Sequence, residues 1–244
     1  MQHKTIIISD IHLWTKDSRH QRVLDFLQKN KCENLILNWD IIDGRHIKIF
    51  GWRPKWHTDL VHYILDLAKS GQTKVFYIAG NHDDFLRKVL PMKYWDISFV
   101  KDMIYNSWNK KYYICHGDKF DRIEWRLFFL STISFLVWSF IFMINRIYNR
   151  WREKRWLKYF SLVKQIKLIA KLLMTGWTKR FEKKLVKTAK WKDCDWIICW
   201  HIHKEENKML GNIHYLNSWD RVEVWTAIIE DYQWNWSIYY YKKD

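Results

Sequence analysis

Short apolar runs alternate with longer amphipathic stretches through the first third of the chain. The runs TIIIS, NLILN and KVFYIA combine β-branched and aromatic residues, which is typical of buried strands. The pattern predicts strands at 5–9, 34–38 and 74–79, with helices around 19–30 and 57–70. Shorter strands are predicted at 111–115 and 196–199, and a hairpin within 221–243. Strand–helix alternation that ends in strand pairs favours a layered α/β domain.

Between about residues 122 and 190 the pattern is helical only, and 127–144 holds 18 residues without a charge. By length this run is a transmembrane candidate. However, polar motifs described below lie on both sides of it, around His116 and His201, and one span would separate them across a membrane. We therefore interpret 122–190 as a helical lid inserted in a single domain covering 1–244. An ordinary buried helix pair remains the alternative.

Positive charge is concentrated in the same region. The net charge is +16, and residues 145–192 contain 16 Lys or Arg but only Glu153 and Glu182 as acids, which makes this segment +14. Such a block predicts a polyanionic partner, either nucleic acid, an anionic bilayer or a phosphorylated substrate. Basic residues beside an apolar helix favour binding to a membrane surface. A solvated helical face is the alternative.

The N-terminus and the cysteines bear on the compartment. MQHKTIIISD lacks the long apolar core of a signal peptide and reads instead as the beginning of a strand. The four cysteines include no CxxC pair, so neither a disulfide framework nor a zinc knuckle is indicated. These features predict a cytoplasmic protein with reduced thiols.

Five polar segments follow runs of strand-forming residues. They are Asp10-Ile11-His12, Asp40 with Asp43, Gly80-Asn81-His82-Asp83, His116-Gly117-Asp118 and His201-Ile202-His203. Open α/β sheets place their ligands at the carboxyl ends of strands, so these segments are expected at such an edge. Carboxylates, imidazoles and an amide oxygen are suited to a divalent metal. Each segment alone is a weak signal, but the ordered set predicts a metal-dependent site.

Two divalent cations in such a site could clamp a phosphate. A carboxylate has two oxygens and can bridge two ions, and alternate residues leaving a strand, as in Asp10 and His12, point the same way. Two ions about 3.5–4 Å apart lower the pKa of a bound water and hold a phosphoryl group in place. The residues therefore point to hydrolysis of a phosphate ester or pyrophosphate.

The ordered motifs resemble those of the calcineurin-like metallophosphoesterase superfamily. The sequence on either side of these motifs is most similar to the UDP-2,3-diacylglucosamine pyrophosphatase family. The stretches that carry this similarity are TIIISDIHL, DIIDG, YIAGNHDDFLR, YYICHGDKFD, ICWHIHK and YLNSWDRVE. The resemblance covers nearly the whole chain, although the lid matches in length and character more than in detail. It implies a four-layer α/β/β/α sandwich with a helical lid.

The resemblance also implies a role for each motif residue. One metal would be bound by Asp10, His12 and His203, the other by Asn81, His116 and His201, with Asp40 bridging the two. His82 would face the phosphate as a proton donor or charge stabiliser, and Asp83 would orient it. The remaining carboxylates would shape the loops: Asp43, Asp118 and Asp121. Arg87, Ser161 and Lys164 would contact substrate, and the family suggests two Mn²⁺ ions.

The implied reaction is attack of a metal-bridging hydroxide on the pyrophosphate of UDP-2,3-diacylglucosamine. It would release UMP and a lipid sugar 1-phosphate, a step of lipid A biosynthesis. The enzyme would be peripheral on the inner face of the cell membrane, with the anionic membrane surface and the lipid-linked nucleotide as partners. Neither a nucleic-acid nor a protein partner is expected. Three alternatives remain: another phosphoester substrate, a nuclease or nucleic-acid binder, and a non-catalytic membrane-surface protein of the same fold.

Tryptophan is abundant where glycine would be expected. The chain has 18 Trp and seven Gly, whereas an average composition would give about 17 Gly. Tryptophan replaces the family's motif glycines at Trp39, Trp200 and Trp219, and falls at glycine-like loop positions at Trp14, Trp108, Trp196 and Trp234. Glycine permits positive φ and close backbone approach to a metal cluster. We interpret many of these tryptophans as UGA codons that the organism reads as glycine; a Trp-rich protein with an inactive site is the alternative.

Overall fold

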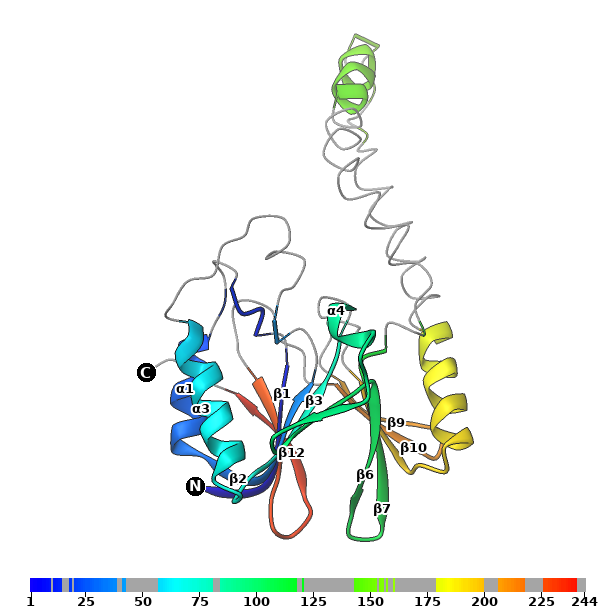
Figure 1. Cartoon of the computed structure of the whole chain (residues 1–244). Coiled ribbons are helices and arrows are strands. Elements are labelled where there is room, and N and C mark those ends of the chain that lie inside the picture. The colour runs from blue at the N-terminus through cyan, green and yellow to red at the C-terminus, as the bar shows by residue number, and fades with distance from the viewer. Residues whose placement is uncertain are drawn as a thin grey trace. The chain divides into compact units, whose positions relative to one another are not determined.

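The computed structural model describes residues 1–9, 11–14, 18, 20–38, 41–42, 57–80, 84–117, 120, 143–152, 154–155, 157, 160, 179–199, 206–217 and 226–240. The chain divides into two compact units. The first comprises Met1–Asp118 and Val186–Asp244, and the second comprises Lys119–Leu185. The first unit contains all the strands of the described residues and is drawn in Figure 1.

A seven-stranded sheet has the order β12-β11-β1-β2-β3-β5-β4. Its strands are β1 (Gln2–Ile8), β2 (Lys31–Asn38), β3 (Lys74–Ile78), β4 (Met92–Tyr94), β5 (Ile97–Val100), β11 (Thr226–Glu230) and β12 (Trp236–Tyr240). Strands β1, β2, β3 and β5 are parallel neighbours, while β11 and β4 run antiparallel to the strands they join. The parallel order places the carboxyl ends of β1, β2 and β3 side by side.

A five-stranded sheet has the order β6-β7-β8-β10-β9. Its strands are β6 (Asp102–Ser107), β7 (Lys110–Cys115), β8 (Trp196–Cys199), β9 (Glu206–Leu210) and β10 (Ile213–Asn217). Strands β7 and β8 are parallel, with Cys115 opposite Cys199, although these two residues are 84 positions apart in the sequence. This pairing joins the strands on either side of the predicted lid.

Alternate residues of β1 and β2 face two different cores. Ile6 and Ile8 pack with α1 (His20–Lys29) and α3 (Thr58–Lys69), whereas Ile7 packs with residues of the five-stranded sheet. Leu35 and Leu37 repeat the first pattern, and Ile36 repeats the second. This period of two follows from the strand pleat and explains why the runs read as continuously apolar. Helices α1 and α3 cover one face of the larger sheet, and the smaller sheet covers the other (Figure 1).

The predicted α/β class with two sheets and covering helices is therefore confirmed. The strands expected at 5–9, 34–38, 74–79, 111–115 and 196–199 and the tail hairpin are present; β8 has the predicted bounds, and the others have shifted boundaries. Strands β4, β5, β6, β9 and β10 and the short helix α4 (Asp84–Arg87) were not predicted. All residues of β4 and β9 are exposed or half-buried, so these two strands lack the apolar signal of the central strands.

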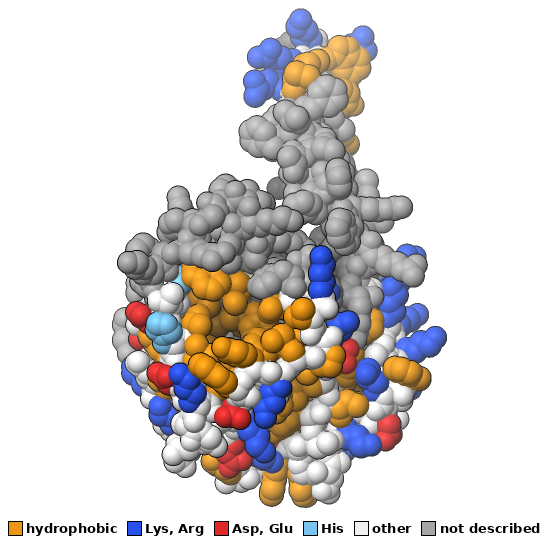
Figure 2. Space-filling view, in the orientation of Figure 1, with side chains coloured by type: hydrophobic (Ala, Val, Ile, Leu, Met, Phe, Trp, Pro, Cys, Tyr) orange, Lys and Arg blue, Asp and Glu red, His pale blue; other side chains and the backbone are white. Residues whose placement is uncertain are grey.

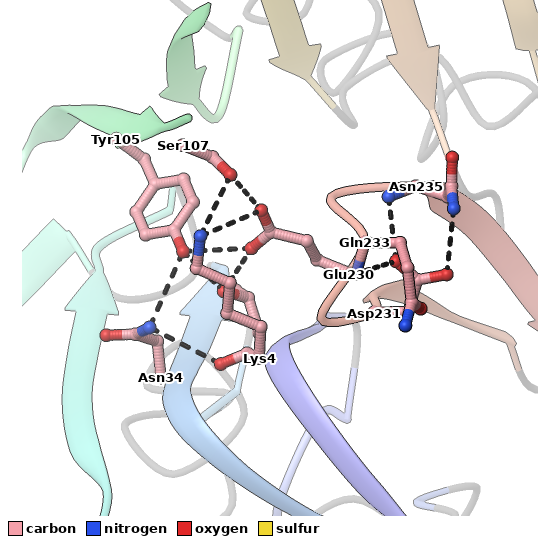
Figure 3. Close-up of polar contacts among 9 residues, drawn as sticks. Lys4, Asn34, Tyr105, Ser107, Glu230, Asp231, Gln233 and Asn235 are labelled. Atoms are coloured by element: carbon pink, nitrogen blue, oxygen red, sulfur yellow. Dashed lines mark hydrogen bonds and ion pairs between the residues drawn. The ribbon is translucent and has the colours of Figure 1, made fainter. Parts of the chain in front are cut away.

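A buried carboxylate joins the two sheets at the edge where β1 and β7 begin. Glu230 is fully buried at the end of β11 and accepts hydrogen bonds from Thr5 Oγ1 (2.6 Å), Tyr105 Oη (2.9 Å) and Ser107 Oγ. Lys4 Nζ lies 3.8 Å from it (Figure 3). Hydrogen bonds from several donors offset the cost of burying this charge. Because the beginnings of both strand sets meet here, their carboxyl ends meet at the opposite edge.

Tryptophan occupies left-handed backbone at an unusual rate. Eight tryptophans lie in the described part, at 14, 95, 108, 151, 191, 196, 234 and 236. Four of them, Trp14, Trp95, Trp108 and Trp234, have φ between 48° and 69°. Only a few per cent of non-glycine residues have positive φ, and a bulky side chain there is an outlier. The glycine-like positions expected for Trp14, Trp108 and Trp234 are thus confirmed, and Trp95 joins them.

Three hairpins of the chain share one turn geometry. Each has a two-residue loop: Trp95-Asp96 between β4 and β5, Trp108-Asn109 between β6 and β7, and Gly211-Asn212 between β9 and β10. In all three, the first loop residue has positive φ (50°, 48° and 64°) and the second does not. That is the pattern of a type II′ turn, whose first position belongs to glycine. Trp95 and Trp108 therefore stand where the third hairpin has Gly211.

This comparison predicts opposite effects for two substitutions. Trp108→Gly is expected to raise the free energy of unfolding by about 1 kcal/mol, because a side chain in left-handed backbone costs ~1–2 kcal/mol. Gly211→Ala is expected to lower it by about 1 kcal/mol from the same backbone term, since a Cβ at Gly211 meets no atom within 4 Å. Chemical denaturation of both variants checks this. A Trp108→Gly chain that is less stable than the parent contradicts it.

The described part of the second unit includes two helical stretches, one at 179–185 and one at 143–152. Asn149 Nδ2 donates to the Phe160 carbonyl and Asn149 Oδ1 accepts from the Phe160 amide, both at 2.8 Å, so the chain folds back on this stretch. No helix among the described residues is long and apolar enough to cross a membrane. The uncharged run 127–144 lies almost wholly outside the described residues.

Candidate active site

Each of the five polar motifs begins within two residues of a strand end. Asp10 follows β1, Asp40 follows β2, and Gly80 follows β3, and these three strands are adjacent and parallel. In the second sheet, His116 follows β7 directly and His201 comes two residues after β8, its parallel neighbour. All five strands end at the edge opposite the Glu230 contacts. The fold therefore brings strand ends that carry motifs as distant in sequence as Asp10 and His203, 193 positions apart, to one edge of the two sheets.

The segment after β1 is held by the segment after β2. The Leu13 amide donates to the Ile41 carbonyl at 2.7 Å, and Leu13 pairs with Ile42 as an isolated parallel bridge. Ser18 Oγ donates to the Ile11 carbonyl at 2.8 Å. Ile11, Leu13 and Ile41 are buried, which anchors both segments in the core. His12, between Ile11 and Leu13, has φ 47° and is half-buried, so its side chain leaves the chain in an uncommon direction.

His116 directly follows β7 in a buried position. Its side chain is 5 % exposed, and Gly117 beside it has φ 105°, which is open to glycine and strained for other residues. Cys199 Sγ donates to the His116 carbonyl at 3.1 Å, so the ends of β7 and β8 are joined directly. A buried thiol that carries no motif signal thus helps to hold the residue after β7 against the end of β8.

Arg87 lies in α4, close to the end of β3. One guanidinium nitrogen, Nη2, donates to the Ala79 carbonyl at 3.2 Å, and Arg87 is half-buried. The Ala79 amide in turn donates to the Val100 carbonyl at 3.1 Å. Arg87 therefore supports the backbone that leads into the motif at Asn81. Its predicted substrate contact stays a prediction.

Most of the predicted site lies outside the described residues. These positions are Asp10, Asp40, Asn81, His82, Asp83, His201, His203, Ser161 and Lys164, together with Asp43, Asp118 and Asp121. Of the seven predicted metal ligands, His12 and His116 are described. Within the described ranges, no group of three or more His, Cys, Asp or Glu side chains is placed to hold a metal ion. The predicted cluster therefore stays a prediction, supported by the strand ends that carry it.

The tryptophans of the motifs are also outside the described residues: Trp39, Trp200 and Trp219. Trp196 is described, and the loop position predicted for it is wrong. It begins β8, where its ring stacks on His214 at 3.7 Å and contacts Tyr112 at 5.1 Å. The strand predicted at 196–199 already included this residue, and β8 spans Trp196–Cys199.

Comparison with known proteins identifies the family. Residues 3–205 match the family "Calcineurin-like phosphoesterase". The chain therefore belongs to the calcineurin-like phosphoesterase family. This membership supports a phosphoester hydrolase, and such enzymes generally use divalent metals. No curated protein matches the chain.

Several solved structures are similar to the chain at low identity. One is wild-type Vps29 in complex with Zn²⁺ from Entamoeba histolytica, with 13 % identity, a TM-score of 0.49, and coverage of 97 % of this chain and 91 % of that one. A second is the phosphoesterase Yfce from E. coli, with 13 % identity, a TM-score of 0.46, and coverage of 93 % and 88 %. A third is an archaeal phosphodiesterase, with 10 % identity, a TM-score of 0.43, and coverage of 97 % and 99 %.

Proposed function

We propose that the chain is a two-metal pyrophosphatase that cleaves UDP-2,3-diacylglucosamine or a similar lipid-linked nucleotide sugar at a membrane surface. The products would be UMP and a lipid sugar 1-phosphate. The observation that carries the hydrolase part is the common edge at which all five motif-bearing strands end. The proposed substrate rests on the similarity of the sequence around the motifs to that pyrophosphatase family and on the apolar and basic character of the second unit.

The donor set fits a pair of divalent cations. Asp10, His12 and His203 would hold one ion, Asn81, His116 and His201 the other, and Asp40 both. The ions would clamp the phosphate and supply a water of lowered pKa. Carboxylate, amide and imidazole donors are compatible with Mn²⁺, although Fe, Zn and Mg accept overlapping sets. The burial of His116 and the fixed loop at His12 give two of these ligands rigid supports.

Two residues of the third motif would act on the substrate itself. His82 would donate a hydrogen bond to the phosphate or a proton to the departing oxygen, and Asp83 would hold its ring in place. Both come after β3, and Ala79, the residue that directly follows this strand, is hydrogen-bonded to Val100 and Arg87. Arg87, Ser161 and Lys164 would bind the remaining charge of the substrate.

The second unit supports binding to an anionic lipid surface. Along 143–152, the apolar side chains of Met143, Ile147 and Trp151 are 47 %, 58 % and 44 % exposed. Arginines are interleaved with them, and the guanidinium of Arg155 lies 4.1 Å from the centre of the Trp151 ring. Figure 2 shows apolar and basic side chains gathered on this stretch. Exposed apolar groups beside cations are suited to the boundary between lipid headgroups and acyl chains.

A substrate comparison tests the proposal. With Mn²⁺ present, UMP release from UDP-2,3-diacylglucosamine in anionic vesicles is expected to exceed release from a plain UDP-sugar by at least about tenfold, because acyl chains add apolar contact area. Equal rates on both would contradict the lipid substrate. Activity on neither, with hydrolysis of a chromogenic phosphodiester retained, would indicate another phosphoester.

Ile147→Glu separates lipid contact from chemistry in the same assay. This variant places a charge where the apolar face would enter the bilayer, so the rate on vesicle-borne substrate is expected to fall about tenfold. Hydrolysis of the soluble phosphodiester is expected to be unchanged. Ile104→Glu is the matched control, because Ile104 is 43 % exposed but lies on β6 in the other unit. Equal losses in both variants would count against a membrane role of 143–152.

Salt-sensitive binding of the chain to DNA in the absence of lipid would favour the alternative function, a nuclease.

A further inference from the structure

His57 connects the beginning of α3 to the segment after β1. It is 2 % exposed, and its side chain does not cap its own helix. Instead its Nδ1 accepts the backbone N–H of Trp14 at 2.6 Å, across 43 residues of sequence. A hydrogen bond of this length between a buried and a half-buried residue helps to fix both partners, because leaving either unsatisfied carries a cost of desolvation.

The amide that His57 holds lies two residues beyond His12. The neighbouring Leu13 amide is held by the Ile41 carbonyl at 2.7 Å, and Ile41 follows Asp40 directly. Two successive amides after His12 are thus fixed from two different elements, one being the beginning of α3 and the other the segment after β2. Trp14 itself has φ 69°, so its left-handed backbone is what directs this N–H at His57. Without an acceptor at 57, the Trp14 amide would lose the partner that holds it in the described structure.

The surroundings of His57 keep its ring neutral. Burial lowers the pKa of His57 to about 4, and the nearby His20 ring, with centroids 4.0 Å apart, adds to this lowering. Burial likewise lowers the pKa of His20, while its contact with the Ser18 backbone and the charge of Asp59 oppose the change. A position at the beginning of a helix also disfavours a cation. At neutral pH, Nδ1 is therefore an acceptor and the ring proton is on Nε2.

We propose that His57 is a positioning residue of the metal centre, which orients His12 by holding the Trp14 amide. The inference rests on the proposed function, in which His12 is a metal ligand. Groups that orient metal ligands typically affect affinity by ~10–100-fold. No polar motif marks His57, since it belongs to the amphipathic pattern that introduces α3.

Three variants of the full chain carrying Trp39→Gly and Trp200→Gly test this role. His57→Leu removes the acceptor and keeps much of the volume. His57→Asn places a carbonyl oxygen on the same branch as Nδ1, so it is the rescue variant. His62→Leu is the matched control, because His62 is exposed on the same helix. The readouts are hydrogen exchange of the Trp14 amide without metal, and Mn²⁺ affinity measured by calorimetry.

The expected result is that His57→Leu speeds exchange at Trp14 and weakens Mn²⁺ binding, each by at least about tenfold. His57→Asn and His62→Leu should leave both readouts within a factor of about three. Unchanged exchange in His57→Leu, or equal losses in His57→Leu and His57→Asn, would overturn the proposal. If the parent binds no Mn²⁺, the proposed function fails together with the metal role, while the exchange readout still reports on the hydrogen bond alone.

Discussion

A chain that carries Trp39→Gly and Trp200→Gly is expected to bind Mn²⁺ at least about a hundredfold more tightly than the chain with tryptophan at both positions, which is ~2.8 kcal/mol. Trp39 directly precedes Asp40, and Trp200 directly precedes His201. Both neighbours are predicted ligands, and glycine lets the backbone approach a metal cluster without a side chain. Two indole rings beside the ions would compete for the same space.

The described part of the structure shows that several tryptophans of this chain occupy positions where the backbone favours glycine. Half of the described tryptophans have positive φ, and two of them occupy hairpin positions where the third equivalent hairpin has Gly211. Trp234 adds a further turn: Asp231 Oδ1 accepts the amides of Gln233 and Asn235 around it, at 2.8 and 2.9 Å (Figure 3). Tryptophan is thus found repeatedly where the backbone itself favours glycine. This is what reading UGA as glycine would produce.

Calorimetry with Mn²⁺ and hydrolysis of a chromogenic phosphodiester measure the effect. Trp236→Gly is the control, because Trp236 lies in β12 and its ring packs on Tyr105 and Tyr112. That substitution is expected to destabilise the fold by about 3 kcal/mol, as truncation of a packed aromatic ring does. Equal metal affinity with tryptophan or glycine at 39 and 200 would refute the steric argument. UGG codons at 39, 200 and 219 would refute the reading of UGA as glycine.

His116→Gln is expected to lose one of two bound Mn²⁺ ions and to reduce phosphodiester hydrolysis by at least about a hundredfold, because the lost ion would no longer stabilise the charge that develops on the phosphoryl group, a contribution of about 10²–10³ in rate. His116 is buried directly after β7, and its backbone carbonyl accepts a hydrogen bond from Cys199 Sγ. Glutamine has a similar volume, so the core around it should persist. Metal content after gel filtration and the hydrolysis rate are the measurements.

His214→Gln is the control for this substitution. His214 lies on β10 in the same sheet, stacked on Trp196, and its Nε2 lies 2.5 Å from Asn207 Oδ1. It is a strand histidine outside the five motifs, so metal content and rate are expected to stay near those of the parent. A His116→Gln chain that keeps two ions and its activity would remove His116 from the site.

The sequence was sufficient to predict the central strands and the edge to which the motifs belong. Runs such as TIIIS are apolar on both faces because Ile7 faces one core and Ile6 and Ile8 face another, and this doubly buried pattern is readable from residues alone. The predicted order of motifs after strands also holds for all five, since β1, β2, β3, β7 and β8 each end just before one.

Other features of the structure leave no recognisable pattern in the amino-acid sequence. The edge strands β4 and β9 hold mostly exposed or half-buried residues, so they lack a clear period. The contacts of Glu230 with Thr5 and Tyr105 join residues 225 and 125 positions apart, which only the packing of two sheets can reveal. His57 and Cys199 support the site through backbone groups, and hydrogen bonds to backbone leave no pattern in side-chain types.

Anomalous diffraction from crystals of the Trp39→Gly, Trp200→Gly chain grown with Mn²⁺ tests the central claim most directly. The account predicts two manganese peaks about 3.5–4 Å apart. They should lie among the side chains of Asp10, His12, Asp40, Asn81, His116, His201 and His203. A crystal soaked to saturation with no peak at this edge of the sheets, or with peaks held by other residues, would contradict it.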